Sequence, residues 1–163
     1  MHKYDYDAIS ALSGTLTKNA ISNGLIMRHH FNVGSAKILG EGNDIDLVVT
    51  FKKGFGEPYL SCTSDEITKF LETQEFFPCI EELYSGEDST NSPFRAFRRG
   101  AFNLIVVDSD KALDHWQAAT QACVAIVKEF GTISKEMRIL IHQIIRRKKV
   151  ISPDNPFEAF AME

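Results

Sequence analysis

The spacing of apolar residues near the start of the chain predicts a helix followed by a strand. Apolar side chains recur at three- and four-residue intervals, the spacing of one helix face: Ile9, Leu12, Leu16, Ala20 and Ile21. We therefore expect a helix over residues 6–22, ended by Asn23-Gly24. Residues 25–33 predict a strand that enters a tight turn at Gly34-Ser35, and residues 36–43 are expected to form a linker.

A second strand is predicted immediately after this linker. Residues 44–51 alternate in polarity at first and then become apolar on both faces, which is typical of a strand that runs from an open edge into a core. Residues 52–62 are rich in glycine and predict a loop. Thr63-Ser64-Asp65-Glu66 then matches a capping box, so we expect a short helix to begin there.

The second half of the chain predicts a hairpin and two helices. Small polar residues over 86–93 predict a loop, and the apolar runs 94–97 and 102–107 predict two strands joined by a turn at 98–101. Two stripes at helical spacing, on either side of Gly131, predict the helices: Leu113, Trp116, Thr120, Cys123 and Val127 in the first, and Met137, Leu140, Ile141, Ile144 and Ile145 in the second. Together these signals predict an α+β fold, a mixed β-sheet with flanking helices.

Composition and charge fit one ordinary globular domain. The chain has 163 residues, of which 44% are hydrophobic and 25% charged, and these values exclude the collagen-like and disordered classes. We expect a single domain over residues 1–151 and a C-terminal tail over 152–163, because the prolines of the tail cannot continue a helix. The net charge of −4 argues against a broad surface for nucleic acid.

The cysteines and the apolar stretches indicate a cytoplasmic protein. Cys62, Cys79 and Cys123 are odd in number and contain no Cys-x-x-Cys pattern, which argues against a disulfide framework or a thiolate zinc site. The longest uncharged stretch, residues 116–127, is too short and too polar to span a bilayer. We therefore expect no contact with a membrane.

Two features within residues 33–49 point to the same kind of ligand. Gly34-Ser35 ends a strand with a residue that lacks Cβ, so backbone N–H groups and a hydroxyl can approach a phosphate closely. Asp44 and Asp46 stand two apart on the next strand, so both side chains leave one face with attachment points roughly 6 to 7 Å apart. Such a pair can bind Mg²⁺ or Mn²⁺ together with a substrate triphosphate. For the acidic pair alone, two solvated carboxylates at a strand start are the simpler interpretation.

The segment Gly34-Ser35 followed by Asp44-Ile45-Asp46-Leu47-Val48-Val49 resembles the signature of the DNA polymerase β-like nucleotidyltransferase superfamily in its small, minimal form, with a spacing one residue shorter than usual. The likeness covers residues 6–51, and it continues more weakly through residues 98–107, which are similar to a hairpin of small phage-encoded proteins of this type. It implies a polymerase β-like fold in which Gly34 and Ser35 hold the β and γ phosphates of an NTP, while Asp44 and Asp46 bind Mg²⁺ or Mn²⁺. An acceptor hydroxyl would attack the α phosphorus, and pyrophosphate would leave.

The superfamily carries a third carboxylate on a later strand, where it completes the metal site and takes the proton of the acceptor. Here the matching position is Asn103, whose amide can neither accept a proton nor contribute negative charge. Asp108 or Asp110 could replace it only in a different strand register, since Asp108 has the opposite parity to Asn103. Asn103 is therefore the third predicted position of the catalytic site, beside Asp44 and Asp46.

Three basic residues are further candidates for contact with the triphosphate. Lys37, Arg98 and Arg99 could each reach it, although charged residues at a hairpin turn commonly face water. The basic run 146–149 falls in the last turn of a helix, where the helix dipole favours cations without any partner. The histidines show no metal-ligand spacing and are interpreted as structural or surface residues.

Two classes of function follow from this sequence. In the first, the protein is a metal-dependent nucleotidyltransferase that binds an NTP with Mg²⁺ and transfers a nucleoside monophosphate to an unknown acceptor, with tRNA as one candidate. In the second, it is a catalytically degenerate phage protein that uses the same cleft or surface to bind a nucleotide or a host protein in the host cytoplasm, and Asn103 favours this alternative. An antitoxin of a two-protein toxin system ranks last.

Overall fold

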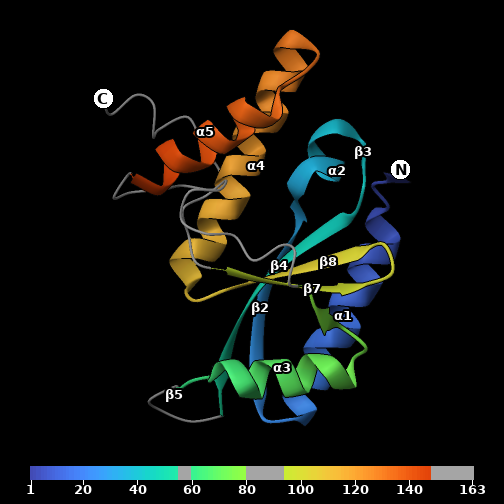
Figure 1. Cartoon of the computed structure of the whole chain (residues 1–163), viewed down its shortest axis with the longest axis vertical. Coiled ribbons are helices and arrows are strands. Elements are labelled where there is room, and N and C mark those ends of the chain that lie inside the picture. Colours follow the sequence, from blue (N-terminus) through green and yellow to red (C-terminus); the bar gives the residue numbers. More distant parts are fainter. Residues whose placement is uncertain (55–59, 80–93, 148–163) are drawn as a thin grey trace.

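The structure, a computed structural model, describes residues 1–54, 60–79 and 94–147 (Figure 1). The elements in chain order are β1 (His2–Lys3), α1 (Tyr6–Ser22), β2 (Leu25–Val33), α2 (Gly34–Leu39), β3 (Glu41–Gly42), β4 (Ile45–Lys53), β5 (Leu60–Ser61), α3 (Ser64–Thr73), β6 (Phe77–Pro78), β7 (Phe94–Arg99), β8 (Phe102–Val107), α4 (Asp110–Phe130) and α5 (Lys135–Arg147). The loop expected at 86–93 and the tail expected at 152–163 lie outside the described residues. None of the helices described is long and apolar enough to cross a membrane.

Within the described residues, five strands form a continuous sheet in the order β2-β4-β8-β7-β6, and β5 pairs with the end of β4. The pair β4 and β8 is parallel, whereas the other neighbouring strands of this sheet are antiparallel. The predicted α+β class with a mixed sheet is therefore confirmed. The strand predicted at 44–51 is central, as expected, but it runs from Ile45 to Lys53, so Asp44 lies directly before it and the first two residues of the predicted loop 52–62 belong to it.

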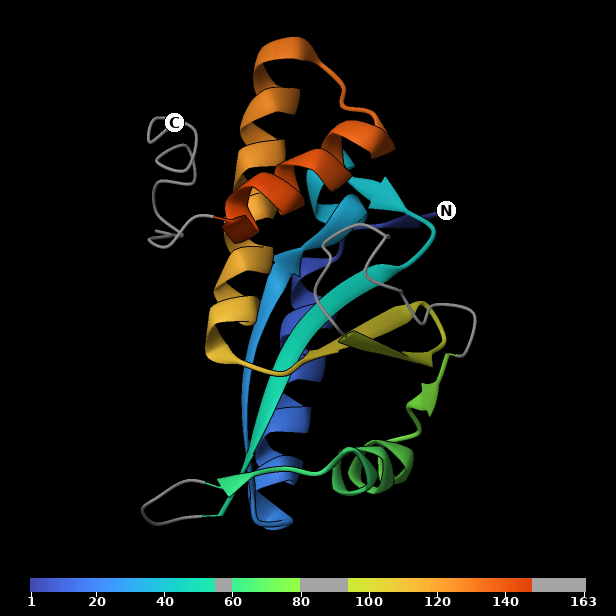
Figure 2. The same ribbon diagram turned by 60° about the vertical axis from the view of Figure 1, so that its left-hand side comes forward.

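The two faces of β4 contact different helices. One face shares a core with α1 and α3 through Leu47, Val49 and Phe51. On the other face, Val48 packs with Trp116 of α4. Because side chains alternate along a strand, Asp46 leaves the sheet on the same side as Val48. Figure 2 shows α1 running along the sheet, with α4 and α5 at the end of the molecule opposite α3.

Most of the predicted helix ends are confirmed, because local capping signals mark them in the sequence. The side chain of Asp5 accepts a hydrogen bond from the Ala8 N–H and so caps α1, whose predicted bounds are confirmed. Thr63 and Glu66 form the predicted capping box of α3. Gly131 ends α4 in the left-handed conformation, with φ +84°, so the predicted break between the C-terminal helices is confirmed.

Two predictions near the candidate site were wrong. Residues 36–43 are not a linker, because they contain most of α2 and the strand β3, which pairs with β1. Arg98 and Arg99 do not lie in the hairpin turn but are the last two residues of β7. The turn needs only Gly100 and Ala101, and Gly100 takes the positive φ that a tight connection requires.

The apolar stripe predicted for the last helix is only partly buried. Ile141 and Ile145 pack into a core with α4, whereas Met137 and Leu140 are 44% and 45% exposed. Helix α5 packs against α4 along the line of Ile141 and Ile145, and one neighbouring helix covers only a narrow stripe of its surface. Residues on the flank of that line therefore remain accessible, although their spacing fits the same periodicity.

Candidate functional site

A cavity of about 330 Å³ opens between the α4 face of the sheet and helix α5. Its lining comes from five elements and the segment before β4: Gly34, Ser35, Ile38, Asn43, Asp44, Asp46, Asn103, Ile105, Trp116, Lys135, Arg138, Ile139 and His142. The glycine turn and both aspartates, which the sequence separates by about ten residues, thus face one space.

The register of the sheet places the predicted third position beside the second. Asp46 of β4 is the Cα partner of Asn103 of β8, and Asn103 is in turn the partner of Arg98 of β7. Neighbouring residues in register point to the same face, so these three side chains form one row across three strands. Asp110 lies far from this row and instead forms ion pairs with Arg28 and Lys52, at 3.0 and 2.9 Å.

Asn103 and Asp46 are joined by a buried hydrogen bond. The Nδ2 of Asn103 donates to Oδ1 of Asp46 at 3.0 Å, and the two residues are only 7% and 8% exposed. The other end of the amide, Oδ1 of Asn103, is buried and accepts no hydrogen bond from the described residues. A buried acceptor without a donor costs free energy, so this oxygen is suited to a ligand that enters the cavity.

Gly34 is pressed directly against Asp46. Its φ is +86°, and a methyl group added there would lie 2.8 Å from Cβ of Asp46 and would overlap the carboxylate. Only glycine fits both this backbone conformation and this approach. The Gly34 N–H is already used, because it donates to Oγ1 of Thr120 at 3.3 Å. Of the predicted pair, Ser35 is therefore the residue whose polar atoms could contact a phosphate.

Asp44 is paired with an arginine in this structure. Nη2 of Arg98 lies 2.9 Å from Oδ2 of Asp44, and both side chains are partly exposed. The sequence analysis assigned the aspartate to a metal and the arginine to a phosphate, and the structure pairs them: Asp44 lines the cavity, whereas Arg98 contacts Asp44 without lining the cavity itself. Either assignment requires the ion pair to open or to share its charges with a ligand.

Two of the predicted phosphate contacts lie elsewhere. Lys37 is exposed and its ammonium stands 5.1 Å from the ring centroid of Tyr4. Arg99 donates to the backbone oxygen of Gln74 and lies over the ring of Phe76, on the face opposite to Arg98. Neither side chain lines the cavity.

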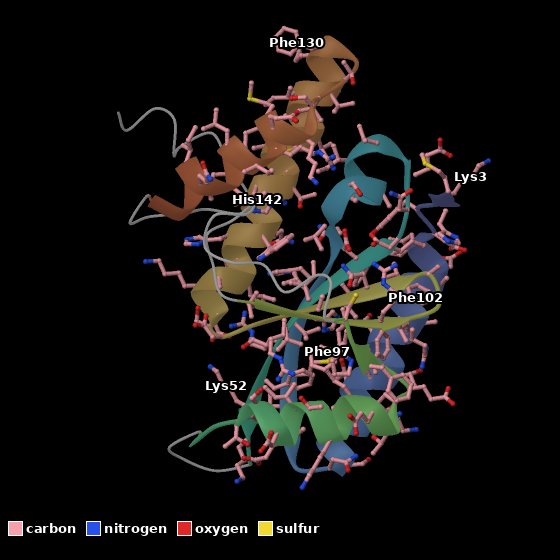
Figure 3. The ribbon with its side chains drawn as sticks, viewed as in Figure 1. Lys3, Lys52, Phe97, Phe102, Phe130 and His142 are labelled. Carbon is pink, nitrogen blue, oxygen red and sulfur yellow. The ribbon has the colours of Figure 1, made fainter. Side chains whose placement is uncertain are left out.

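Helix α5 supplies a second wall that the sequence analysis missed. Lys135, Arg138 and His142 recur at three- and four-residue spacing, which places them on one face of the helix. His142, labelled in Figure 3, lies on α5. Its ring packs edge-on against Trp116 of α4, with 4.7 Å between the ring centroids. Burial, together with the charge of Arg138, lowers the pKa of His142 to about 4, so its imidazole is neutral at neutral pH.

The sequence shows the spacing of this polar stripe, because Lys135, Arg138 and His142 lie next to the apolar positions 141 and 145 around the helix. It does not show that the stripe faces the sheet.

The cavity offers oxygen donors that suit a hard divalent cation. Within residues 1–54, 60–79 and 94–147, no group of three or more His, Cys, Asp or Glu side chains gathers around a common point. The cavity presents instead two carboxylates, Asp44 and Asp46, and the unsatisfied amide oxygen of Asn103. Mg²⁺ commonly takes one or two carboxylates and completes its shell with water and substrate phosphates, so these residues fit that ion.

Comparison with known proteins adds no family. No protein-family model matches the chain, and none of the curated proteins is similar enough to match it.

Proposed function

We propose that the cavity binds the Mg²⁺ complex of a nucleoside triphosphate, and that the fold is of the DNA polymerase β-like nucleotidyltransferase type. The observation that carries this proposal is the convergence of Ser35, Asp44 and Asp46 on one cavity, with Gly34 pressed against the second aspartate. A hydroxyl beside two carboxylates is the combination that a metal-bound triphosphate needs.

The arrangement of strands supports the proposed fold. Asp46 is the second residue of the central strand β4 and Asp44 directly precedes that strand, while the neighbouring parallel strand β8 carries Asn103 in register with Asp46. This is the position that the resemblance assigns to the third metal-site residue. The short helix α2 follows the strand β2 at Gly34, so the glycine turn lies beside the start of β4.

Asp44, Asp46 and Oδ1 of Asn103 would hold the ion. The ion would neutralise part of the triphosphate charge and fix the orientation of the phosphates. Asp46 is nearly buried and would be the fixed ligand, whereas Asp44 at the rim would exchange Arg98 for the ion. The released guanidinium would then be free to contact a phosphate oxygen.

A transferase reaction on this site would join an acceptor hydroxyl oxygen to the α phosphorus, break the bond to pyrophosphate and release the hydroxyl proton. Asn103 cannot take that proton. Its Nδ2 is committed to Asp46, so the cavity is stable with an amide in place of the third carboxylate. This observation favours the second candidate function, binding of a nucleotide or of a host protein without transfer.

Calorimetric titration with Mg·ATP, Mg·GTP, Mg·CTP and Mg·UTP tests the binding proposal. We expect the wild-type protein to bind at least one of them, and Asp46→Asn to weaken that binding by roughly tenfold or more, because the ion loses its buried carboxylate ligand. Asp108→Asn is the matched control, since it removes the same charge from an exposed position at the far end of β8. A wild-type protein that binds none of the four, or an Asp46→Asn variant that binds equally well, would refute the proposal.

Pyrophosphate release separates the two candidates. Wild-type protein is incubated with the NTP that it binds, with and without total tRNA as acceptor. Release that depends on Mg²⁺ and disappears in Asp46→Asn would establish transfer and exclude the binding-only function. Binding without any release would favour the second candidate.

A further inference from the structure

The side chain of Arg138 places a cation in the lining of the cavity. It is half-buried, lines the cavity, and its Nε is buried without a hydrogen-bond acceptor among the described residues. No described carboxylate lies within ion-pair distance of it. A buried guanidinium nitrogen without an acceptor costs free energy, so Arg138 is suited to an anionic ligand that enters the cavity.

Lys135 adds a second cation on the same side. It stands three residues before Arg138 on α5 and also lines the cavity, although its own side chain is exposed. The planar guanidinium can donate two parallel hydrogen bonds to one phosphate, and the ammonium can contact a neighbouring phosphate as a point charge.

The charges of the cavity are divided between its two walls. Asp44 and Asp46 lie on the sheet side, and Lys135 and Arg138 lie on the α5 side. A divalent cation alone would leave Lys135 and Arg138 on the α5 wall without an anion. A polyphosphate alone would place its negative charges against those of the aspartates. A polyphosphate that carries its own divalent cation matches both walls, because its metal faces the carboxylates and its oxygens face the cations.

We propose that Arg138 and Lys135 form the polyphosphate-binding wall of this cavity, and that the cavity recognises the metal-bound triphosphate group rather than the nucleoside. This inference rests on the proposed function and assigns the phosphate contacts to α5 in place of Lys37 and Arg99. The two residues would thereby fix the orientation of the ligand in the cavity, with the metal ion at the sheet and the terminal phosphates at α5.

The remaining polar residues of this wall fit the same ligand. His142 is one turn beyond Arg138 and is neutral, so it adds no charge but offers a ring nitrogen to a phosphate oxygen. Asn103 presents an acceptor to the metal on the opposite wall. The buried Nε of Arg138 and the buried Oδ1 of Asn103 would therefore each find a partner of the correct polarity in one metal–triphosphate complex.

Calorimetry with three probes tests the inference: Mg·ATP, Mg²⁺ with inorganic triphosphate, and adenosine alone. We expect inorganic triphosphate to bind within roughly tenfold of Mg·ATP and adenosine to show no binding, because the phosphates supply most of the contacts. Arg138→Gln should lose roughly tenfold or more for both phosphate probes, and Arg138→Lys should recover part of the loss because it restores the charge without the planar fork.

Lys135→Gln and Lys128→Gln form a matched pair. Both remove an exposed lysine at the α4–α5 end of the molecule, and only Lys135 lines the cavity. We expect Lys135→Gln to weaken binding of both phosphate probes several-fold and Lys128→Gln to leave it unchanged. Because Lys135 is exposed, this pair gives an answer even if Arg138→Gln fails to fold.

The outcomes separate the inference from the function on which it rests. If wild-type protein binds neither inorganic triphosphate nor any of the four Mg·NTPs, the proposed function fails and the inference fails with it. If wild-type protein binds Mg·ATP while Lys135→Gln and the folded Arg138 variants bind it equally well, only the inference is overturned. Binding of Mg·ATP without inorganic triphosphate would also overturn it, because the nucleoside would then supply the recognition.

Discussion

Asn103 donates a hydrogen bond to Asp46 across the parallel strands β8 and β4, with 3.0 Å between Nδ2 and Oδ1. The amide lets Asp46 remain in a buried position without a second carboxylate beside it. Two carboxylates at this distance would repel each other strongly in the absence of a metal. The pair therefore gives one oxygen of Asp46 a hydrogen-bond donor and still keeps one amide oxygen for a ligand.

Replacing this amide by an acid should make the protein depend on metal. In Asn103→Asp, two buried carboxyl groups face each other, so we expect the metal-free protein to lose about 2 to 4 kcal/mol of unfolding free energy at neutral pH. Mg²⁺ should restore most of this loss, and so should mild acid, because one carboxyl then takes up a proton. Chemical denaturation with Mg²⁺ and with a chelator measures the effect, and equal stability in the two solutions would contradict it.

Gly34 should tolerate no side chain. Gly34→Ala combines a positive φ with an overlap on Asp46, so we expect it to lower the unfolding free energy by about 2 to 4 kcal/mol and to weaken binding of Mg·ATP. Gly14→Ala is the control, because Gly14 lies exposed within α1 with open space around it. Helix propensity predicts that this change stabilises the protein by about 0.5 to 1 kcal/mol. Thermal and urea denaturation of both variants would show whether the two glycines differ in this way.

Arg98 should compete with a metal ion for Asp44. Its guanidinium is 2.9 Å from the carboxylate, so a free divalent ion must displace a positive charge to reach this ligand. We expect Arg98→Gln to raise the affinity for Mn²⁺ alone several-fold, as followed by the electron paramagnetic resonance signal of free Mn²⁺. Arg99→Gln, one residue along on the other face, should leave that affinity unchanged. A weaker Mn²⁺ affinity in Arg98→Gln would show that the arginine does not oppose the ion.

His142 should make stability fall in mild acid. Its folded-state pKa is lowered to about 4, below the ordinary value of 6.5, so the unfolded chain binds the proton more tightly. Stability is therefore retained above about pH 6.5 and lost as the pH falls towards 4. Between about pH 7.5 and pH 5 this single group should cost about 2 kcal/mol.

The variant His142→Gln tests this assignment. It removes the titrating group, so its unfolding free energy should fall by about 2 kcal/mol less than that of wild type between the same two pH values. His2→Gln, at an exposed position of β1, is the control and should follow the wild-type curve. Identical pH dependence in wild type and His142→Gln would show that the imidazole is not held neutral by its surroundings.

Most of the fold could be predicted because local signals and periodicity agree along the chain. The bounds of α1 and β2 match the prediction, since the apolar spacing is regular and Asp5 and Asn23 mark the helix ends. The helix α2 could not be predicted, because it has only six residues and its start at Gly34 reads as a turn. Its formation depends on packing against α4, which local sequence does not report.

The candidate site could be predicted on one wall only. Asp44, Asp46, Asn103 and Ser35 lie where strand parity and the glycine turn placed them. The α5 wall was missed because contacts between the sheet and a helix about ninety residues later are set by tertiary packing, and periodicity gives a helix's faces but not its neighbour. The phosphate contact predicted for Arg99 was wrong for the same reason. Arg98 and Arg99 are adjacent residues of β7, so their side chains leave the sheet on opposite faces, and Arg99 faces away from the cavity.

The central claim is that the bend at Gly34 and the two aspartates form one pocket for a metal-bound triphosphate. Crystals grown with Mn²⁺ and a non-hydrolysable NTP analogue test it most directly, because the anomalous signal of manganese locates the ion without reference to the protein atoms. The account predicts a manganese peak at coordination distance from Asp46, with the triphosphate between Ser35 and Arg138. A peak at any other place, or a nucleotide bound outside this cavity, would contradict it.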